Sequence, residues 1–171
     1  LRGLLVFYYL ATYVVSCRLA HQLGIGYGSK VILVIALVAY APPGSMAGSH
    51  YNIVSILFFL ICFSALIAWV QAEGSSYKNG SRNVLILAGC SAGLCFTAKY
   101  NIGVYAFVAL LAALLMHLRG DIIRRRGLQV MALVTGAFIL PVIGMLLLIG
   151  FSGGIEKFIE YTVQNKALYM Q

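Results

Sequence analysis

Apolar runs close to the length of a membrane-crossing helix occupy most of this sequence. Six such runs, separated by short polar or Gly-rich joints, cover residues 4–19, 30–42, 51–71, 84–98, 101–118 and 128–150. A helix rises about 1.5 Å per residue, so about 20 residues cross a hydrocarbon core of about 30 Å. The second and fourth runs are short, and we expect neighbouring protein or a thinner bilayer around them. The pattern predicts an all-α fold: a polytopic transmembrane helix bundle with about six spans in residues 1–150.

The composition excludes a water-soluble domain. Only 9% of the residues are charged and 62% are hydrophobic, whereas about a quarter of the residues in a soluble domain are charged. The net charge of +8 comes from basic residues scattered between the apolar runs, which is typical of membrane topology and not of a nucleic-acid-binding patch. We therefore expect membrane lipid as a partner and no nucleic acid.

The two ends of the chain predict a fragment of a longer membrane protein. The chain enters an apolar run directly after Leu1 and stops at Gln171 in a mixed stretch, so we expect the remaining transmembrane helices of the same protein to pack against it. In residues 155–171 apolar side chains recur every three to four positions. This spacing predicts an amphipathic interfacial helix, within residues 151–171, that begins an extracytoplasmic loop. Packing of this helix on another domain is an equally good interpretation.

The stretch 84–118 is a single apolar run interrupted only by Lys99, Tyr100 and Asn101. As one helix it would be about 50 Å long, far more than a bilayer accepts. We predict a hairpin here, which also places eight of the twelve Lys and Arg residues on one side, as expected for a cytoplasmic face. These eight are Arg18, Lys30, Lys78, Arg82, Arg119, Arg124, Arg125 and Arg126. The compact loops favour a bacterial inner membrane.

Lys99 is the first candidate for a functional residue. A lysine between two apolar spans must reach the interface or find a partner. It is either an interfacial anchor or a cation that binds a lipid-linked phosphate. Tyr100 and Asn101 would add neutral hydrogen bonds to that phosphate.

The joint at residues 43–50 is the second candidate site. Pro42 and Pro43 end the preceding run, and His50, Tyr51 and Asn52 stand at the start of the next. An N-cap formed by Ser49 or Asn52 would explain these polar residues. Alternatively, because the joint faces the same side as the lysine hairpin, His50, Tyr51 and Asn52 line a shared cavity.

Other features predict packing and not chemistry. Gly89 and Gly93 form a G-x-x-x-G pair, which is typical of a close helix–helix contact. The four cysteines lie in apolar runs without a zinc spacing, so we interpret them as packing residues and expect no metal within this stretch. Pro141 is expected to kink the last span. No predicted span contains Asp or Glu, which argues against an ion-coupled carrier.

The run LILAGCSAGLCFTAKYNIGVYAFVALLAALL, residues 85–115, resembles a block of membrane glycosyltransferases of the C-type fold. That superfamily includes the dolichyl-phosphate-mannose protein mannosyltransferases and the lipid A aminoarabinose transferases. In both, a Gly-containing apolar helix ends in a Thr-x-Lys-like turn and a second apolar helix follows. The order of the flanking parts, from RLAHQLG at residues 18–24 through the Pro-containing joint, is also similar.

The resemblance implies an enzyme that transfers a hexose or pentose from a polyprenyl-phosphate-linked donor on the extracytoplasmic face. It matches Lys99 to the family's hairpin lysine, and it places the catalytic carboxylate before Leu1. This chain has His50, Tyr51 and Asn52 where many relatives carry an acidic residue, so these residues are limited to hydrogen bonding. We expect no cofactor within this stretch, and a divalent metal in the full-length protein is left open. The alternatives are a transporter, a flippase for lipid-linked saccharides, and a non-catalytic membrane subunit.

Overall fold

The computed structural model describes residues 2–25, 46–73, 80–118, 125–154 and 156, and these residues form five helices without strands. The helices are α1 (Arg2–Gln22), α3 (Met46–Glu73), α4 (Gly80–Ala98), α5 (Tyr100–His117) and α6 (Arg125–Phe151). The predicted all-α fold is confirmed for this part of the chain. The predicted span at 30–42 and the amphipathic helix at 155–171 lie outside the described residues, apart from Glu156.

Three of the helices are long and apolar enough to cross a membrane. Their apolar segments are Ile53–Ala72, Tyr100–His117 and Gly127–Phe151, and a shorter apolar helix covers Arg82–Ala98. In these three segments large aliphatic and aromatic side chains outnumber polar ones, so lipid is a better solvent for their outer faces than water. The chain therefore has the helices of a membrane-embedded protein.

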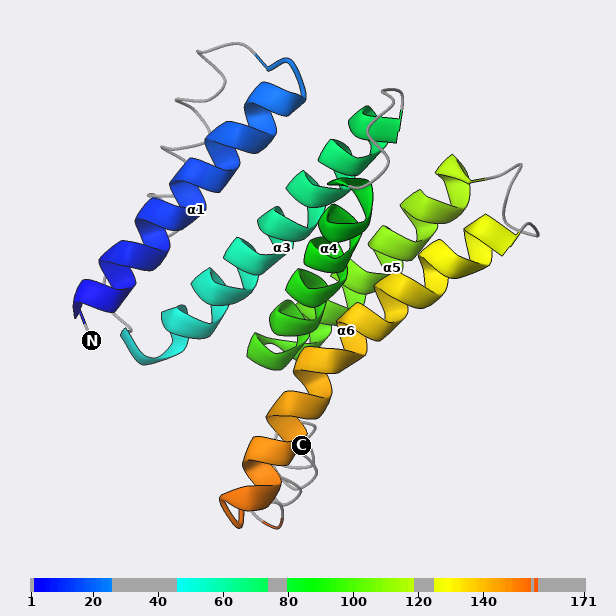
Figure 1. Ribbon diagram of the computed structural model, residues 1–171. Coiled ribbons are helices and arrows are strands. Elements are labelled where there is room, and N and C mark those ends of the chain that lie inside the picture. The colour runs from blue at the N-terminus through cyan, green and yellow to red at the C-terminus, as the bar shows by residue number, and fades with distance from the viewer. Residues whose placement is uncertain (1, 26–45, 74–79, 119–124, 155, 157–171) are drawn as a thin grey trace, which may run out of the picture.

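The helices form a bundle in which α4 occupies the centre. It packs against α3, α5 and α6, whereas α1 packs against α3 at the edge. Figure 1 shows that α1, α3 and α5 run towards the end of the bundle at which α4 and α6 begin. Because α1 and α3 run parallel, the chain leaves α1 at one end of the bundle and enters α3 at the other.

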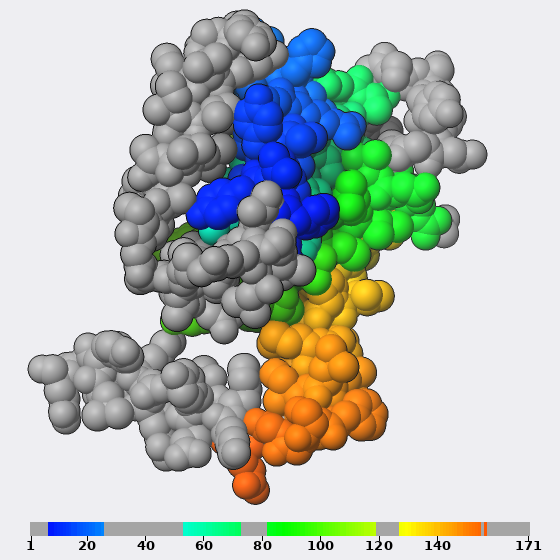
Figure 2. All heavy atoms as spheres, turned by 90° about the vertical axis from the view of Figure 1, so that its left-hand side faces the viewer, coloured from blue at the N-terminus to red at the C-terminus, as the bar shows by residue number. Residues whose placement is uncertain are grey.

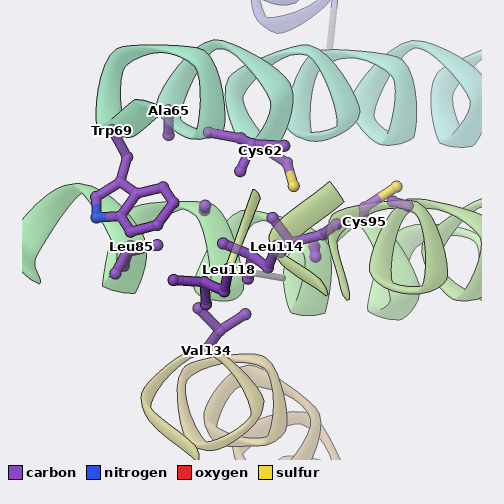
Figure 3. Close-up of a cluster of buried hydrophobic side chains, with 13 residues drawn as sticks. Cys62, Ala65, Trp69, Leu85, Cys95, Leu114, Leu118 and Val134 are labelled. Atoms are coloured by element: carbon purple, nitrogen blue, oxygen red, sulfur yellow. The ribbon is translucent and has the colours of Figure 1, made fainter. Parts of the chain in front are cut away.

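The core consists of side chains from four helices. Figure 3 shows Trp69 of α3 pointing towards Leu85 of α4, with Leu118, which directly follows α5, and Val134 of α6 below them. Trp69 is only 2% exposed and lies edge-on to His117, with 5.3 Å between the ring centroids. These contacts join the C-terminal ends of α3 and α5 to the N-terminal half of α4, which makes α4 antiparallel to both neighbours.

The predicted close contact at Gly89 and Gly93 is confirmed, and its partner is α6. A Cβ atom at Gly89 would lie 2.6 Å from the backbone oxygen of Val134, and one at Gly93 would collide with the backbone oxygen of Phe138. Only glycine allows the two backbones to approach this closely. The interpretation of the cysteines as packing residues holds for Cys62 and Cys95, which are fully buried in the core.

α6 continues through Pro141 to Phe151 without interruption. Proline lacks the N–H that would bond to the carbonyl one turn earlier, which loosens a helix at that point. Figure 1 shows the axis of α6 changing direction between its yellow N-terminal half and its orange C-terminal half, as the predicted kink requires. Figures 1 and 2 both show the C-terminal half extending past the end of the bundle.

Several boundaries differ from those predicted. The joint at 43–50 is shorter than expected because α3 already begins at Met46, and α4 begins at Gly80 and not at Val84. Apolar runs report the part of a helix that lies in hydrocarbon, whereas these helices extend further into polar sequence at both places. Ser49 and Asn52 lie inside α3, so neither is its N-cap, and that explanation of the polar residues is wrong.

Candidate functional site

The break predicted at Lys99 is present, and it consists of a single residue. α4 ends at Ala98 and α5 begins at Tyr100, and Lys99 between them has an extended backbone with φ −152° and ψ 101°. Its N–H donates to the carbonyl of Cys95 over 2.8 Å, and its carbonyl accepts from the N–H of Gly103 over 3.0 Å. Both helices therefore use the backbone of Lys99 to complete their terminal turns.

A glycine makes this tight turn sterically feasible. A Cβ atom at Gly103 would collide with the backbone of Phe96, so any other residue there would push α5 away from α4. Towards the interior, Phe107 stacks on Phe138 of α6 with 4.0 Å between ring centroids, and Phe96 meets the same ring edge-on at 5.8 Å. This aromatic cluster fixes the ends of α4 and α5 against α6. The sequence pattern did not predict this aromatic cluster, although a phenylalanine on each of three neighbouring apolar runs could have indicated it.

The structure brings the three predicted donor-phosphate residues to the same end of the bundle. Lys99 is partly buried, Tyr100 is 54% exposed, and Asn101 is exposed. The Asn101 side-chain oxygen accepts a hydrogen bond from the N–H of Ile102 over 3.0 Å, at the first turn of α5. The N-terminal N–H groups of a helix carry partial positive charge, which adds to that of the lysine. The carbonyl ends of α4 lie beside them and offset part of this effect.

His50, Tyr51 and Asn52 lie in the first two turns of α3, at the same end of the bundle as the Lys99 turn. Near this end, a hydrogen bond joins α4 to α3: the Cys95 thiol of α4 donates to the carbonyl of Ser55 of α3 over 3.2 Å. α3 and α4 run antiparallel, so moving one turn back from Ser55 in α3 and one turn forward from Cys95 in α4 reaches the same height in the bundle. Tyr51 and Asn52 thus share a level with Lys99, as the hypothesis of one shared cavity requires, and a cavity itself stays a prediction.

The charges divide between the two ends of the bundle. Within the described helices, Arg18, Arg82, Arg125 and Arg126 lie at the end where α1 finishes and α4 and α6 begin. Arg2 and Lys99 lie at the opposite end. This division agrees with the predicted topology, in which the lysine faces away from the arginine-rich side.

The described residues are poor in metal-binding and acidic side chains. They contain no group of three His, Cys, Asp or Glu side chains that could hold a metal ion. The chain has only four carboxylates, at Glu73, Asp121, Glu156 and Glu160, and α4 and α5 contain none of them. α4 and α5 therefore place no carboxylate beside Lys99, and the catalytic carboxylate expected before Leu1 stays a prediction.

No protein-family model matches the chain, and neither the curated proteins nor the solved structures contain a significant match. The class that the described structure defines is thus an all-helical protein with three helices suited to crossing a membrane.

Proposed function

We propose that this chain belongs to a multi-pass integral-membrane glycosyltransferase that uses a polyprenyl-phosphate-linked sugar donor. The sugar passes to an acceptor on the extracytoplasmic face of a bacterial inner membrane, and the chain contributes about six spans and an interfacial helix after α6. The observation that carries the proposal is the one-residue turn at Lys99. It presents a lysine at the end of the bundle opposite Arg18, Arg82, Arg125 and Arg126, level with Tyr51 and Asn52 of α3.

The chemistry of this turn suits the phosphate half of a glycosyl transfer. When the acceptor attacks the anomeric carbon, the bond from that carbon to the phosphate oxygen breaks and negative charge grows on the phosphate. An ammonium group and neutral hydrogen-bond donors held nearby stabilise this charge. Lys99 supplies the cation, and Tyr100 and Asn101 supply the hydrogen bonds. A carboxylate elsewhere in the full-length protein takes the acceptor proton.

The decisive experiment compares Lys99→Ala and Lys99→Arg in the full-length protein, with transfer from a polyprenyl-phosphate sugar as the readout. We expect the Ala variant to lose about 10- to 100-fold in kcat/KM, the equivalent of one charged hydrogen bond, and the Arg variant to retain most of it. Tyr105→Ala is the matched control, because Tyr105 lies one to two turns away on the same helix and is 72% exposed. Unchanged turnover in Lys99→Ala would remove the lysine from the site.

The same preparation of the full-length protein distinguishes a transferase from a flippase and from a non-catalytic subunit. A protein that moves lipid-linked saccharides between leaflets of a vesicle, without transferring the sugar, would be a flippase. A protein with neither activity would be a non-catalytic subunit. Labelling a cysteine placed at Ser152, just past the apolar end of α6, from the outside of intact cells tests the topology, and labelling only from the cytoplasm would overturn it.

A further inference from the structure

α4 and α6 run parallel, and their contacts fix which residues lie at the same height in the bundle. Gly89 lies opposite Val134 and Ala137, and Gly93 lies opposite Phe138 and Pro141. A residue of α4 is therefore level with the residue 45 to 48 positions later in α6. On this register Arg82 is level with the start of the apolar segment Gly127–Phe151. The polar ends of both helices thus coincide on the arginine side.

The C-terminal ends of α4 and α6 do not lie at the same height. Extended along α6 past Pro141, where the observed contacts end, the same register brings Lys99 level with Gly144 to Leu147, and α6 continues from there to Phe151. The remaining four to seven residues correspond to about 6–10 Å of helix. Figures 1 and 2 show this part of α6 projecting beyond the turn between α4 and α5.

The projecting part of α6 is apolar on every side. Residues 142–151 read VIGMLLLIGF, and Leu146, Leu148 and Phe151 are 49%, 72% and 88% exposed. Exposing such a cylinder to water would cost about 25 cal/mol for each Å² of apolar surface. Polar sequence begins only at Ser152, where Gly153 with φ 67° ends the helix in a Schellman motif closed by the bond from the Gly154 N–H to the Ile149 carbonyl. A hydrocarbon layer that reaches past the level of Lys99 would cover this surface.

We infer that the Lys99 turn is recessed within the bilayer, and that the acceptor of the sugar is consequently an amphiphile that reaches the turn sideways from the membrane. This inference rests on the proposed function. The donor phosphate held by Lys99 fixes the anomeric carbon one bond away, below the level of the α6 terminus. An acceptor hydroxyl must attack that carbon while the phosphate leaves with the bonding electrons and a carboxylate of the full-length protein takes the proton. A hydroxyl on a soluble molecule would have to leave the water completely, whereas a lipid is already anchored in the hydrocarbon layer by its acyl chains and has only to lower its headgroup to the level of the turn.

The depth is measured without any activity assay. In the full-length protein with its native cysteines replaced by Ala, a fluorophore is attached at Asn101→Cys or, as the control, at Ser152→Cys, and the protein is placed in phosphatidylcholine nanodiscs. We expect iodide in the water to quench the Asn101 label about threefold less than the Ser152 label, because hydrocarbon excludes ions. A lipid carrying a nitroxide near the top of its acyl chain should show the reverse order. Equal quenching of both labels by iodide would overturn the recessed position.

The acceptor class is tested separately. Membranes containing the wild-type protein are given a polyprenyl-phosphate donor with a radiolabelled sugar, and the products are partitioned between organic solvent and precipitated protein. The inference expects the new label in a lipid other than the donor, and label in the protein fraction would overturn it while leaving the transferase intact. Absence of transfer with a recessed label would count against the proposed function and against the acceptor class that rests on it, but not against the depth.

Discussion

The helix α4 and the C-terminal half of α6 are both apolar, yet they occupy opposite environments. α4 presents small residues, among them Gly89, Ala92, Gly93 and Cys95, and is enclosed by three helices. The end of α6 carries Leu, Ile, Met and Phe side chains, and none of residues 142–151 is buried. In lipid, large apolar side chains gain no hydrophobic free energy from facing protein, whereas small ones allow backbones to approach and pack closely. Side-chain size therefore separates the enclosed helix α4 from the exposed end of α6, although the core that surrounds α4 also holds the large side chains of Trp69, Leu110 and Leu114.

Trp69→Ala should have the largest effect of any single truncation. The tryptophan fills the space between α3, α4 and the end of α5, and its loss should cost about 3–5 kcal/mol of unfolding free energy. Unfolding in mixed detergent micelles measures this, with Leu148→Ala in the exposed half of α6 as the matched control. Equal costs for the two variants would mean that α6 is covered by protein, and the contrast between the regions would disappear.

Leu140→Lys should come next. Leu140 lies near the middle of the segment Gly127–Phe151 and is 68% exposed. A lysine at mid-membrane depth should cost about 2.5–3.5 kcal/mol of insertion free energy, whereas Leu140→Ala should change insertion and stability little. A glycosylation-based insertion assay compares the two. If lysine is tolerated as well as alanine, this face of α6 lines water and not lipid.

Gly93→Ala should destabilise the contact between α4 and α6 by about 1–3 kcal/mol, because the added methyl meets the backbone of Phe138, which cannot move aside cheaply. Gly136→Ala on α6 is the matched control, since a Cβ atom there meets nothing within 4 Å. The control should be neutral or slightly stabilising, because alanine favours helix. Thermal melting in nanodiscs compares the variants, and a neutral Gly93→Ala would contradict the observed register.

Ser64→Ala should have the smallest effect. The Ser64 hydroxyl donates to the Gln22 side-chain oxygen over 2.9 Å, which links α3 to α1 at the edge of the bundle. Interhelical hydrogen bonds in membrane proteins contribute about 0.6 kcal/mol on average. The same micelle-unfolding experiment should show a loss of this order, and a loss comparable to that of Trp69→Ala would make the edge contact as important as the core.

The sequence predicted the features that depend on length and chemistry alone. The break at Lys99 follows from an apolar run too long for a bilayer, and the role of Gly89 and Gly93 follows from their spacing. Sequence analysis could not find the partner of those glycines, the collision that only Gly103 avoids, or the start of α3 at Met46. These depend on which faces meet in three dimensions. The recessed level of Lys99 is of the same kind, because it arises from the register between α4 and α6.

The single-residue turn at Lys99 has a consequence for how the protein is made. Before the lysine, α4 has an apolar run of only 15 residues, from Val84 to Ala98, and two of them, Ser91 and Thr97, are polar. Such a run is shorter than a nascent helix needs to partition stably from the translocon on its own. Because α5 follows without a spacer, the ribosome must deliver both helices before either settles. The pair should then enter the membrane together, with the lysine at its tip.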